Sequence, residues 1–314
     1  EAEARLDAIA EQMLRPLSRE EVVLKPERPA EVVSNTTRDA YLGKVVKAKE
    51  YILQGDIFQV QISQRLRRPL STRPFDVYRM LRTVNPSPYL YYFDLPDAQI
   101  VGSSPELLVK VQRDESGRRI VDTRPIAGTR KRGSTYEEDA RIARELLADE
   151  KECAEHLMLI DLSRNDIGRI AKVGTVETNE MMIIEKYSHV MHIVSNVRGE
   201  LRDDLGTMDA FWSCFPAGTL TGAPKVRAME IIYELEEEKR GIYGGAVGFL
   251  DFKGNLTTAI TIRTMVVSDG TIYFQAAGGI VADSKPESEY EETMSKMRAG
   301  LTAVENIEAS EGMY

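Results

Sequence analysis

Three apolar runs late in the chain are separated by very short polar turns, and this arrangement constrains the fold strongly. The runs cover residues 246–252, 256–267 and 271–281, and the turns between them are residues 253–255 and 268–270. Turns of three residues join antiparallel neighbours, whereas parallel strands need long crossover connections. We therefore predict a late pair of antiparallel hairpins.

The rest of the chain mixes helical and strand-like segments, without a Pro/Gly/Ser-rich linker. Residues 57–65 alternate, which puts Phe58, Val60 and Ile62 on one face of a strand and Gln59 on the opposite, polar face. Antiparallel strands early and late, with helices between them, favour an α+β fold. Other predicted strands cover 89–95 and 100–112, and predicted helices cover 36–54, a pair within 134–162 that breaks near Asp149, and a last helix that begins at Pro286.

Composition excludes some partners. The 314 residues carry a formal net charge of −9 and contain no basic cluster, which argues against nucleic acid. No run reaches the roughly 18 apolar residues that a membrane helix needs. Cys153 and Cys214 form neither a disulfide framework nor a CxxC metal motif, so we expect a cytoplasmic protein with reduced thiols.

Two glutamate pairs with the same spacing lie far apart in the chain. Glu152 and Glu155 form one pair, and Glu289 and Glu292 form the other. At this spacing on a helix, both carboxylates of a pair project from the same face. Four such acids in one pocket would suit Mg²⁺, which prefers carboxylates and retained waters. Each pair alone is more often an ordinary solvated helix face.

Other polar residues are ambiguous on their own. Arg263 lies in an otherwise apolar predicted strand and would need a carboxylate partner there. Gly278 and Gly279 end another predicted strand, where they indicate either a bulge or a close approach of backbone to ligand. His189 and His192 would point to opposite faces of a strand, so at most one can face a given site.

A series of motifs in one order carries a resemblance that no single motif could. The chain reads GDIFQVQISQR, GSSPELL, RPIAGTR, KECAEHLMLIDLSRND, YSHVMHIVSNV, AGTLTGAPK, IYGGAVGF, AITIRT and DSKPESEYEET. It resembles the chorismate-utilising enzymes, and most closely the anthranilate synthase component I group. The resemblance implies two large antiparallel β-sheets packed as a sandwich with helices outside, chorismate as substrate and Mg²⁺ as cofactor.

The resemblance also implies roles for individual residues. Glu155 and Glu292 would ligate the metal, and Glu152 and Glu289 would hold its waters. Tyr243 and Arg263 would clamp the enolpyruvyl carboxylate, and Glu106 would donate a proton to the leaving C4 hydroxyl. His192 would assist the loss of pyruvate, and Gln59 completes the catalytic set. The other implied substrate contacts are Thr129, Thr219, Gly278, Gly279 and Lys296.

Two positions distinguish subfamilies. Relatives that add water to chorismate carry a lysine base where this chain has Gln59, and aminodeoxychorismate synthases typically carry a nucleophilic lysine where it has Ala127. Direct addition of ammonia at C2, giving anthranilate and pyruvate, is therefore favoured. Two alternatives stay open: an aminodeoxychorismate synthase with an atypical PIAGT motif, and a non-catalytic fragment that binds chorismate or a partner.

The resemblance further suggests partners and a domain division. Neither cysteine resembles the nucleophile of a glutaminase, so ammonia would come from solution or from a separate glutamine amidotransferase subunit in a heteromeric complex. We expect residues 1–35 to be an N-terminal helix and connector, the remnant of a longer family segment, and residues 36–314 to form the chorismate-binding catalytic domain. Half of a tryptophan feedback pocket would remain, and without its other half we expect no micromolar tryptophan binding. The retained pocket residues would be Asn85, Pro86, Ser87 and Tyr89.

Overall fold

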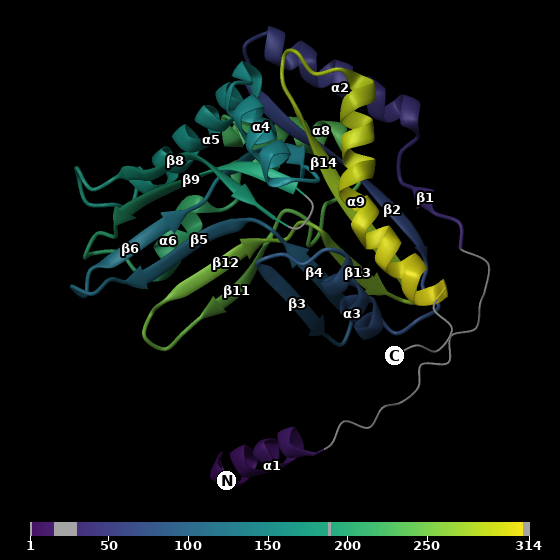
Figure 1. Cartoon of the computed structure of the whole chain (residues 1–314), viewed down its shortest axis with the longest axis vertical. Coiled ribbons are helices and arrows are strands. Elements are labelled where there is room, and N and C mark those ends of the chain that lie inside the picture. The colour runs from purple at the N-terminus through teal and green to yellow at the C-terminus, as the bar shows by residue number, and fades with distance from the viewer. Residues whose placement is uncertain (1, 16–29, 188–189, 310–314) are drawn as a thin grey trace.

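A computed structural model describes residues 2–15, 30–187 and 190–309 of the chain (Figure 1). Within these residues the fold consists of two antiparallel sheets with covering helices, which confirms the predicted α+β class. The helices are α1 (Ala2–Leu14), α2 (Arg38–Leu53), α3 (Pro74–Val84), α4 (Tyr136–Leu147), α5 (Glu150–Gly168), α6 (Thr207–Cys214), α7 (Gly218–Thr221), α8 (Lys225–Leu235) and α9 (Pro286–Ala309).

Each sheet has strands from both halves of the chain. The first sheet has the order β1 (Val33–Ser34), β2 (Gln59–Pro69), β14 (Thr271–Ile280), β13 (Thr264–Ser268), β4 (Gln99–Ser104) and β3 (Tyr89–Asp94), with β10 (Gly222–Ala223) paired to β2. The second sheet has the order β11 (Ala246–Leu250), β12 (Leu256–Ile260), β5 (Leu107–Arg113), β6 (Arg119–Thr123), β9 (Val190–Glu200) and β7 (Ile126–Lys131), with β8 (Glu177–Lys186) paired to β9.

The predicted hairpins are confirmed, but one predicted strand is two. β11 pairs with β12 and β13 pairs with β14, whereas residues 256–267 break between β12 and β13 and change sheets there. Arg263 lies in this break with a positive φ of 50°, which a continuous strand does not accommodate. The prediction that Arg263 belongs to a strand is therefore wrong.

A second change of sheet lies beside the first. Residues 100–112 form β4 and β5, which belong to different sheets and are separated by Pro105 and Glu106. The backbone N–H of Ser103 donates to the carbonyl oxygen of Arg263 at 3.2 Å, and that of Ile260 donates to the carbonyl oxygen of Glu106 at 3.0 Å. These hydrogen bonds hold the side chains of Glu106 and Arg263 at the junction between the two sheets.

Helices cover both sheets, and those predicted from the sequence start close to the predicted positions: α2 begins at Arg38, α5 at Glu150 and α9 at Pro286. α3 and α9 share one apolar core with the first sheet, α2 and α8 share another with it, and α5 and α6 pack on the second sheet (Figure 1). The helix caps are ordinary: Thr37 accepts from the N–H of Ala40, and Asp149 accepts from the N–H groups of Lys151 and Glu152.

Strand β2 differs from its predicted alternation. Gln59 is only 1% exposed, whereas Phe58, predicted to share a face with Val60 and Ile62, is 72% exposed. Phe58 precedes the strand, and both faces of β2 are buried from Gln59 to Gln64. The polar face predicted for Gln59 is thus an interior face, which points to a polar site inside the fold.

Candidate active site

Glu106 is a buried carboxyl group at the junction of the two sheets. It is 9% exposed, and the hydroxyl of Thr219, in the short helix α7, donates to its Oε1 at 2.8 Å. Burial raises the pKa of Glu106 to about 7, against the opposing effects of the Thr219 hydrogen bond and the charge of Lys296. A carboxyl with this pKa can donate a proton near neutral pH.

The two predicted glutamate pairs come from α5 and α9. Burial raises the pKa of Glu155, and the charges of Glu152 and Glu292 raise it further, so the two helices bring these acids within interaction range. Gln59 donates from its amide to Glu155 Oε1 at 3.1 Å, which joins β2 to the same group. Glu289 is 7% exposed, and the charge of Glu292 adds to burial in raising its pKa.

Positively charged side chains partly neutralise the negative charge of these acids. Arg130 donates to Glu152 Oε1 at 2.9 Å, and Lys296 pairs with Glu292 Oε1 at 2.6 Å. Lys296 also donates to the carbonyl oxygen of Ala277 in β14 at 2.9 Å. Arg130 was missed from the sequence, since nothing in the RPIAGTR motif alone indicates which acid its second arginine meets.

The acids fit a divalent cation in chemistry, although not in preformed geometry. Among residues 2–15, 30–187 and 190–309, no three Asp, Glu, His or Cys side chains are grouped closely enough to hold a metal. Glu289 Oε2, however, is buried without a hydrogen-bond partner among the described residues. A buried carboxylate oxygen without a hydrogen-bond partner, near the charge of Glu292, is the kind of hard donor that Mg²⁺ prefers.

The paired glycines of β14 make room for these side chains. A Cβ at Gly279 would lie 2.8 Å from Gln61 Nε2 and 2.9 Å from Gln59 Nε2, and one at Gly278 would lie 3.1 Å from Glu289 Oε2. The pairing of β14 with β2 is regular through both positions, so the bulge considered for this segment does not occur. The glycines instead allow a close approach of polar side chains to the strand.

Tyr243 and Arg263 lie near one another at the same junction. Burial raises the pKa of Tyr243 and lowers that of Arg263, and the charge of Glu292 acts in the opposite direction on Arg263. Arg240 donates to the carbonyl oxygens of Leu220 and Gln61, each at 2.6 Å, and its guanidinium lies 5.7 Å from the Tyr243 ring centre. Arg240 therefore ties α7 and β2 to Tyr243, a function that the sequence did not reveal.

His192 in β9 is oriented by β7. Its Nδ1 lies 3.2 Å from the carbonyl oxygen of Gly128 and 3.0 Å from the hydroxyl of Thr129. Because a carbonyl can only accept, we assign the proton to Nδ1, which leaves Nε2 as an acceptor. Burial lowers the pKa of His192, which favours the neutral ring. His189 lies outside the described residues.

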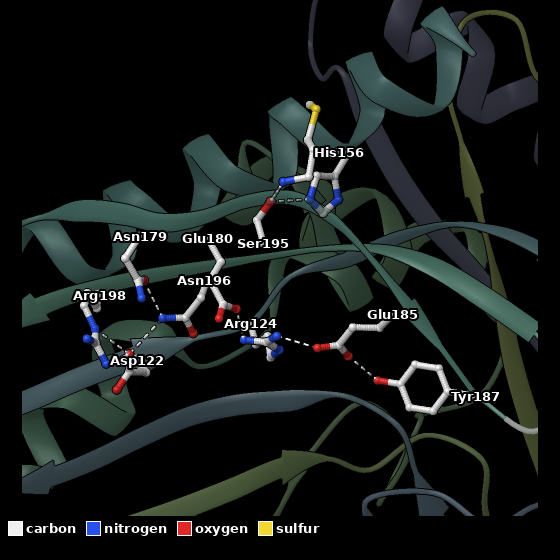
Figure 2. A network of polar contacts seen from close by, with 11 residues as sticks. Asp122, Arg124, His156, Asn179, Glu180, Glu185, Tyr187, Ser195, Asn196 and Arg198 are labelled. Carbon is white, nitrogen blue, oxygen red and sulfur yellow. Dashed lines mark hydrogen bonds and ion pairs between the residues drawn. The ribbon is translucent and has the colours of Figure 1, made fainter. Parts of the chain in front are cut away.

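A polar network supports the strand that carries His192 (Figure 2). Arg124 donates to Glu180 at 2.7 Å and also to Glu185, whose other oxygen accepts from the Tyr187 hydroxyl at 2.7 Å. The Tyr187 ring meets the His192 ring edge to face at 5.6 Å between centres. The network thus runs from the connection between β6 and β7 to the ring of His192.

A buried histidine fastens the acidic helix to the same sheet (Figure 2). His156 Nε2 lies 2.7 Å from Ser195 Oγ, which accepts from the backbone N–H of Met182 at 2.9 Å. Burial lowers the pKa of His156 to about 4, so the ring is neutral. His156 follows Glu155 directly, and this contact fixes the position of α5 against β9.

The predicted tryptophan-pocket residues lie where α3 leads into β3. The backbone carbonyl of Asn85 accepts from Ser103, and Tyr89 pairs with Ser104 at the start of β3. Pro86 and Ser87 form the connection between them. Their role in a tryptophan pocket stays a prediction.

Comparisons with known proteins relate this chain to enzymes that bind chorismate. A family model described as chorismate binding enzyme matches residues 1–302. Curated proteins named anthranilate synthase component 1 are 59% identical over 274 residues in Acetivibrio thermocellus and 56% identical over 278 residues in Aquifex aeolicus. These matches cover 87% and 88% of this chain and 54% and 55% of the relatives, so the chain spans about half the length of the curated proteins it matches.

Solved structures agree with the fold. Anthranilate synthase component I from Streptococcus pneumoniae TIGR4 has a TM-score of 0.86 and 44% identity, covering 95% of this chain and 65% of its own. MenF, the menaquinone-specific isochorismate synthase from Escherichia coli, has a TM-score of 0.80 at 18% identity, covering 96% and 68%, and supports the fold alone. None of the helices in the described residues is long and apolar enough to cross a membrane. The chain belongs to the chorismate binding enzymes.

Proposed function

We propose that this chain is the synthase subunit of an anthranilate synthase, which converts chorismate and ammonia into anthranilate, pyruvate and water in the first step of tryptophan biosynthesis. The proposal is carried by the buried carboxyl of Glu106, whose pKa of about 7 suits a general acid. Its support includes curated relatives named anthranilate synthase component 1 at 51–59% identity.

The chain's own residues then act in sequence. Ammonia adds to C2 of the ring while the C4–O bond breaks, and Glu106 gives its proton to the departing oxygen, which leaves as water. The added nitrogen, which is then an ammonium, releases one proton to solvent. Loss of the C2 proton and cleavage of the C3–O bond follow, and the released enolpyruvate takes up a proton to become pyruvate. His192, with Nε2 free to accept, is suited to take up the C2 proton and to return it to the released enolpyruvate.

Binding and orientation are assigned to the surrounding side chains. Tyr243 and Arg263 would hold the enolpyruvyl carboxylate, since a buried guanidinium requires an anionic partner. Thr219, Gly279 and Lys296 would complete the substrate shell. Because Glu106 is already buried, chorismate bound against these groups would exclude water from the reacting carbons.

Mg²⁺ is proposed as the cofactor. Glu155 and Glu292 would hold it directly, and Glu152 and Glu289 would hold its waters. When bound, the ion supplies positive charge that neutralises the ring carboxylate of chorismate. The partnerless, buried Oε2 of Glu289 supports this proposal, because a cation nearby would relieve an otherwise unfavourable burial.

Two residues favour anthranilate over other products. Position 59 is a glutamine, whose amide donates a hydrogen bond to Glu155, and not a lysine that could activate water. Ala127, in β7, cannot form a covalent bond to C2 as a lysine could. We also propose that a separate glutamine amidotransferase subunit delivers ammonia in the cytoplasm, and that free ammonium can replace it.

The test is incubation of the purified chain with chorismate, Mg²⁺ and ammonium salt. Near-ultraviolet fluorescence of anthranilate, absent when chorismate or ammonium is omitted, is the expected result. Aminodeoxychorismate as the product would favour the aminodeoxychorismate synthase alternative. Binding of chorismate without turnover would favour the non-catalytic alternative. Glutamine alone should give no product, because neither cysteine has the setting of a glutaminase nucleophile: Cys214 is buried and its pKa is raised to about 12.

A further inference from the structure

A small cavity lies against Glu106, apart from most of the proposed substrate shell. Its volume is about 40 Å³, and of the proposed substrate and acid residues only Glu106 and Thr219 line it within the described part of the chain. The lining also joins the buried Thr123 to Ser163 and Asp166, which are partly exposed. Because one water needs roughly 10–15 Å³ of such space, the cavity has room for about three waters.

Thr123, one of the residues that line the cavity, has an unsatisfied hydroxyl. Thr123 is 6% exposed, and its Oγ1 has no hydrogen-bond partner among the described residues. Burying a hydroxyl without a partner is unfavourable, whereas a polar cavity of this size holds water readily when two to four polar groups surround it. Thr123, Ser163, Asp166 and Glu106 provide such groups within one lining.

Glu106 needs a proton source in each turnover. The carboxyl is 9% exposed, and its hydrogen-bonding neighbour, Thr219, carries no ionisable group. The ammonium group of Lys296, which influences Glu106, already donates to the Ala277 carbonyl and pairs with Glu292. Asp166, which also lines the cavity, is paired with Lys225 at 2.7 Å. Neither Asp166 nor Lys225 is therefore placed to supply a proton directly to Glu106.

We propose that this cavity binds ordered water hydrogen-bonded to Thr123 and that the water carries protons from solvent to Glu106. The inference rests on the proposed function. Each turnover transfers the Glu106 proton to the oxygen of the breaking C4–O bond, which departs as water. The carboxylate then takes a proton from the adjacent cavity water, and a proton relayed from solvent restores that water.

The water is tested by a high-resolution crystal structure of the chain. An ordered water within hydrogen-bonding distance of Thr123 Oγ1 is expected, and a dry cavity would overturn the inference. Thr123→Val preserves the shape of the side chain and removes the hydroxyl. If the cavity were dry, this substitution would raise the melting temperature by removing an unsatisfied group; a hydrated cavity predicts no rise.

The proton route is tested by steady-state kinetics with ammonium. Thr123→Val should lower kcat on the order of tenfold, leave the KM for chorismate unchanged and increase the solvent deuterium isotope effect, because proton delivery becomes slower. Thr123→Ser keeps the hydroxyl and should retain the kcat and isotope effect of the unmodified chain. Unchanged kinetics in Thr123→Val would refute the route even if water is present. A chain that makes no anthranilate refutes the proposed function and the route together, while the crystal structure still decides whether water is bound.

Discussion

Replacing Glu106 by glutamine should stabilise the chain at alkaline pH, because the native fold buries a carboxyl that must ionise there. Burial raises its pKa from 4.5 to about 7. Each tenfold change in an equilibrium constant corresponds to about 1.4 kcal/mol, so ionised Glu106 lowers the free energy of unfolding by about 3 kcal/mol. Glutamine is neutral and can still accept the hydrogen bond that Thr219 donates to Oε1 at 2.8 Å.

The direction of the pH dependence follows from proton binding. Between the unfolded pKa of 4.5 and the native pKa of about 7, the native state binds more protons than the unfolded state. The contribution of Glu106 is therefore fully favourable below 4.5 and is lost as the pH rises through 7. The stability gap between the glutamine variant and the unmodified chain should be about 1 kcal/mol at pH 5.5 and about 3 kcal/mol at pH 8.

The assay is urea unfolding of the unmodified chain, Glu106→Gln and a control variant at both pH values. Glu115→Gln is a matched control, because Glu115 is exposed in the turn between β5 and β6. It should show the same small difference at both pH values. A gap for Glu106→Gln that does not widen with pH, or a variant less stable than the unmodified chain at pH 8, would refute the claim that burial raises this pKa. Activity of Glu106→Gln should fall by about 10²-fold or more.

Three further substitutions test other parts of the site. Glu155→Gln should weaken the Mg²⁺ dependence of turnover without unfolding the chain, measured by metal titration and circular dichroism; an unchanged titration would remove Glu155 from the metal site. Gly279→Ala should lower activity with the fold intact, since the new Cβ would lie 2.9 Å from Gln59 Nε2; full activity would show that this side chain moves freely. Arg240→Met should destabilise the chain by about 3 kcal/mol in urea unfolding, because the buried carboxylate of Glu236 loses its cation and keeps, within the described residues, only the hydrogen bond from the N–H of Ser63; a loss below about 1 kcal/mol would contradict this.

Local sequence patterns predicted most elements because short turns and caps act within a few residues. The hairpins at 253–255 and 268–270, the cap at Asp149 and the helix that begins at Pro286 all follow from such local chemistry. The break around Arg263 could not be predicted this way. Its apolar and β-branched neighbours favour a strand, and only the tertiary demand of changing sheets overrides them.

The candidate site also contains residues that could be predicted and residues that could not. The resemblance supplied the acids and Glu106. The structure brings Glu155 close enough to Glu152 and Glu292 for their charges to interact, whereas Glu106 interacts with Lys296. The arginines that hold the site were missed, since Arg240 and Arg130 contact partners far away in the sequence. The burial of Gln59 was also missed, because alternation indicates two faces of a strand but not whether solvent or protein covers the polar one.

The most direct test of the central claim is the fate of labelled nitrogen. The chain is incubated with chorismate, Mg²⁺ and ¹⁵N-ammonium, and the products are identified by mass spectrometry and by a pyruvate assay. We expect one ¹⁵N atom in each anthranilate and one pyruvate for each anthranilate formed. Consumption of chorismate into an aminated product that retains its enolpyruvyl group, without pyruvate release, would contradict the account.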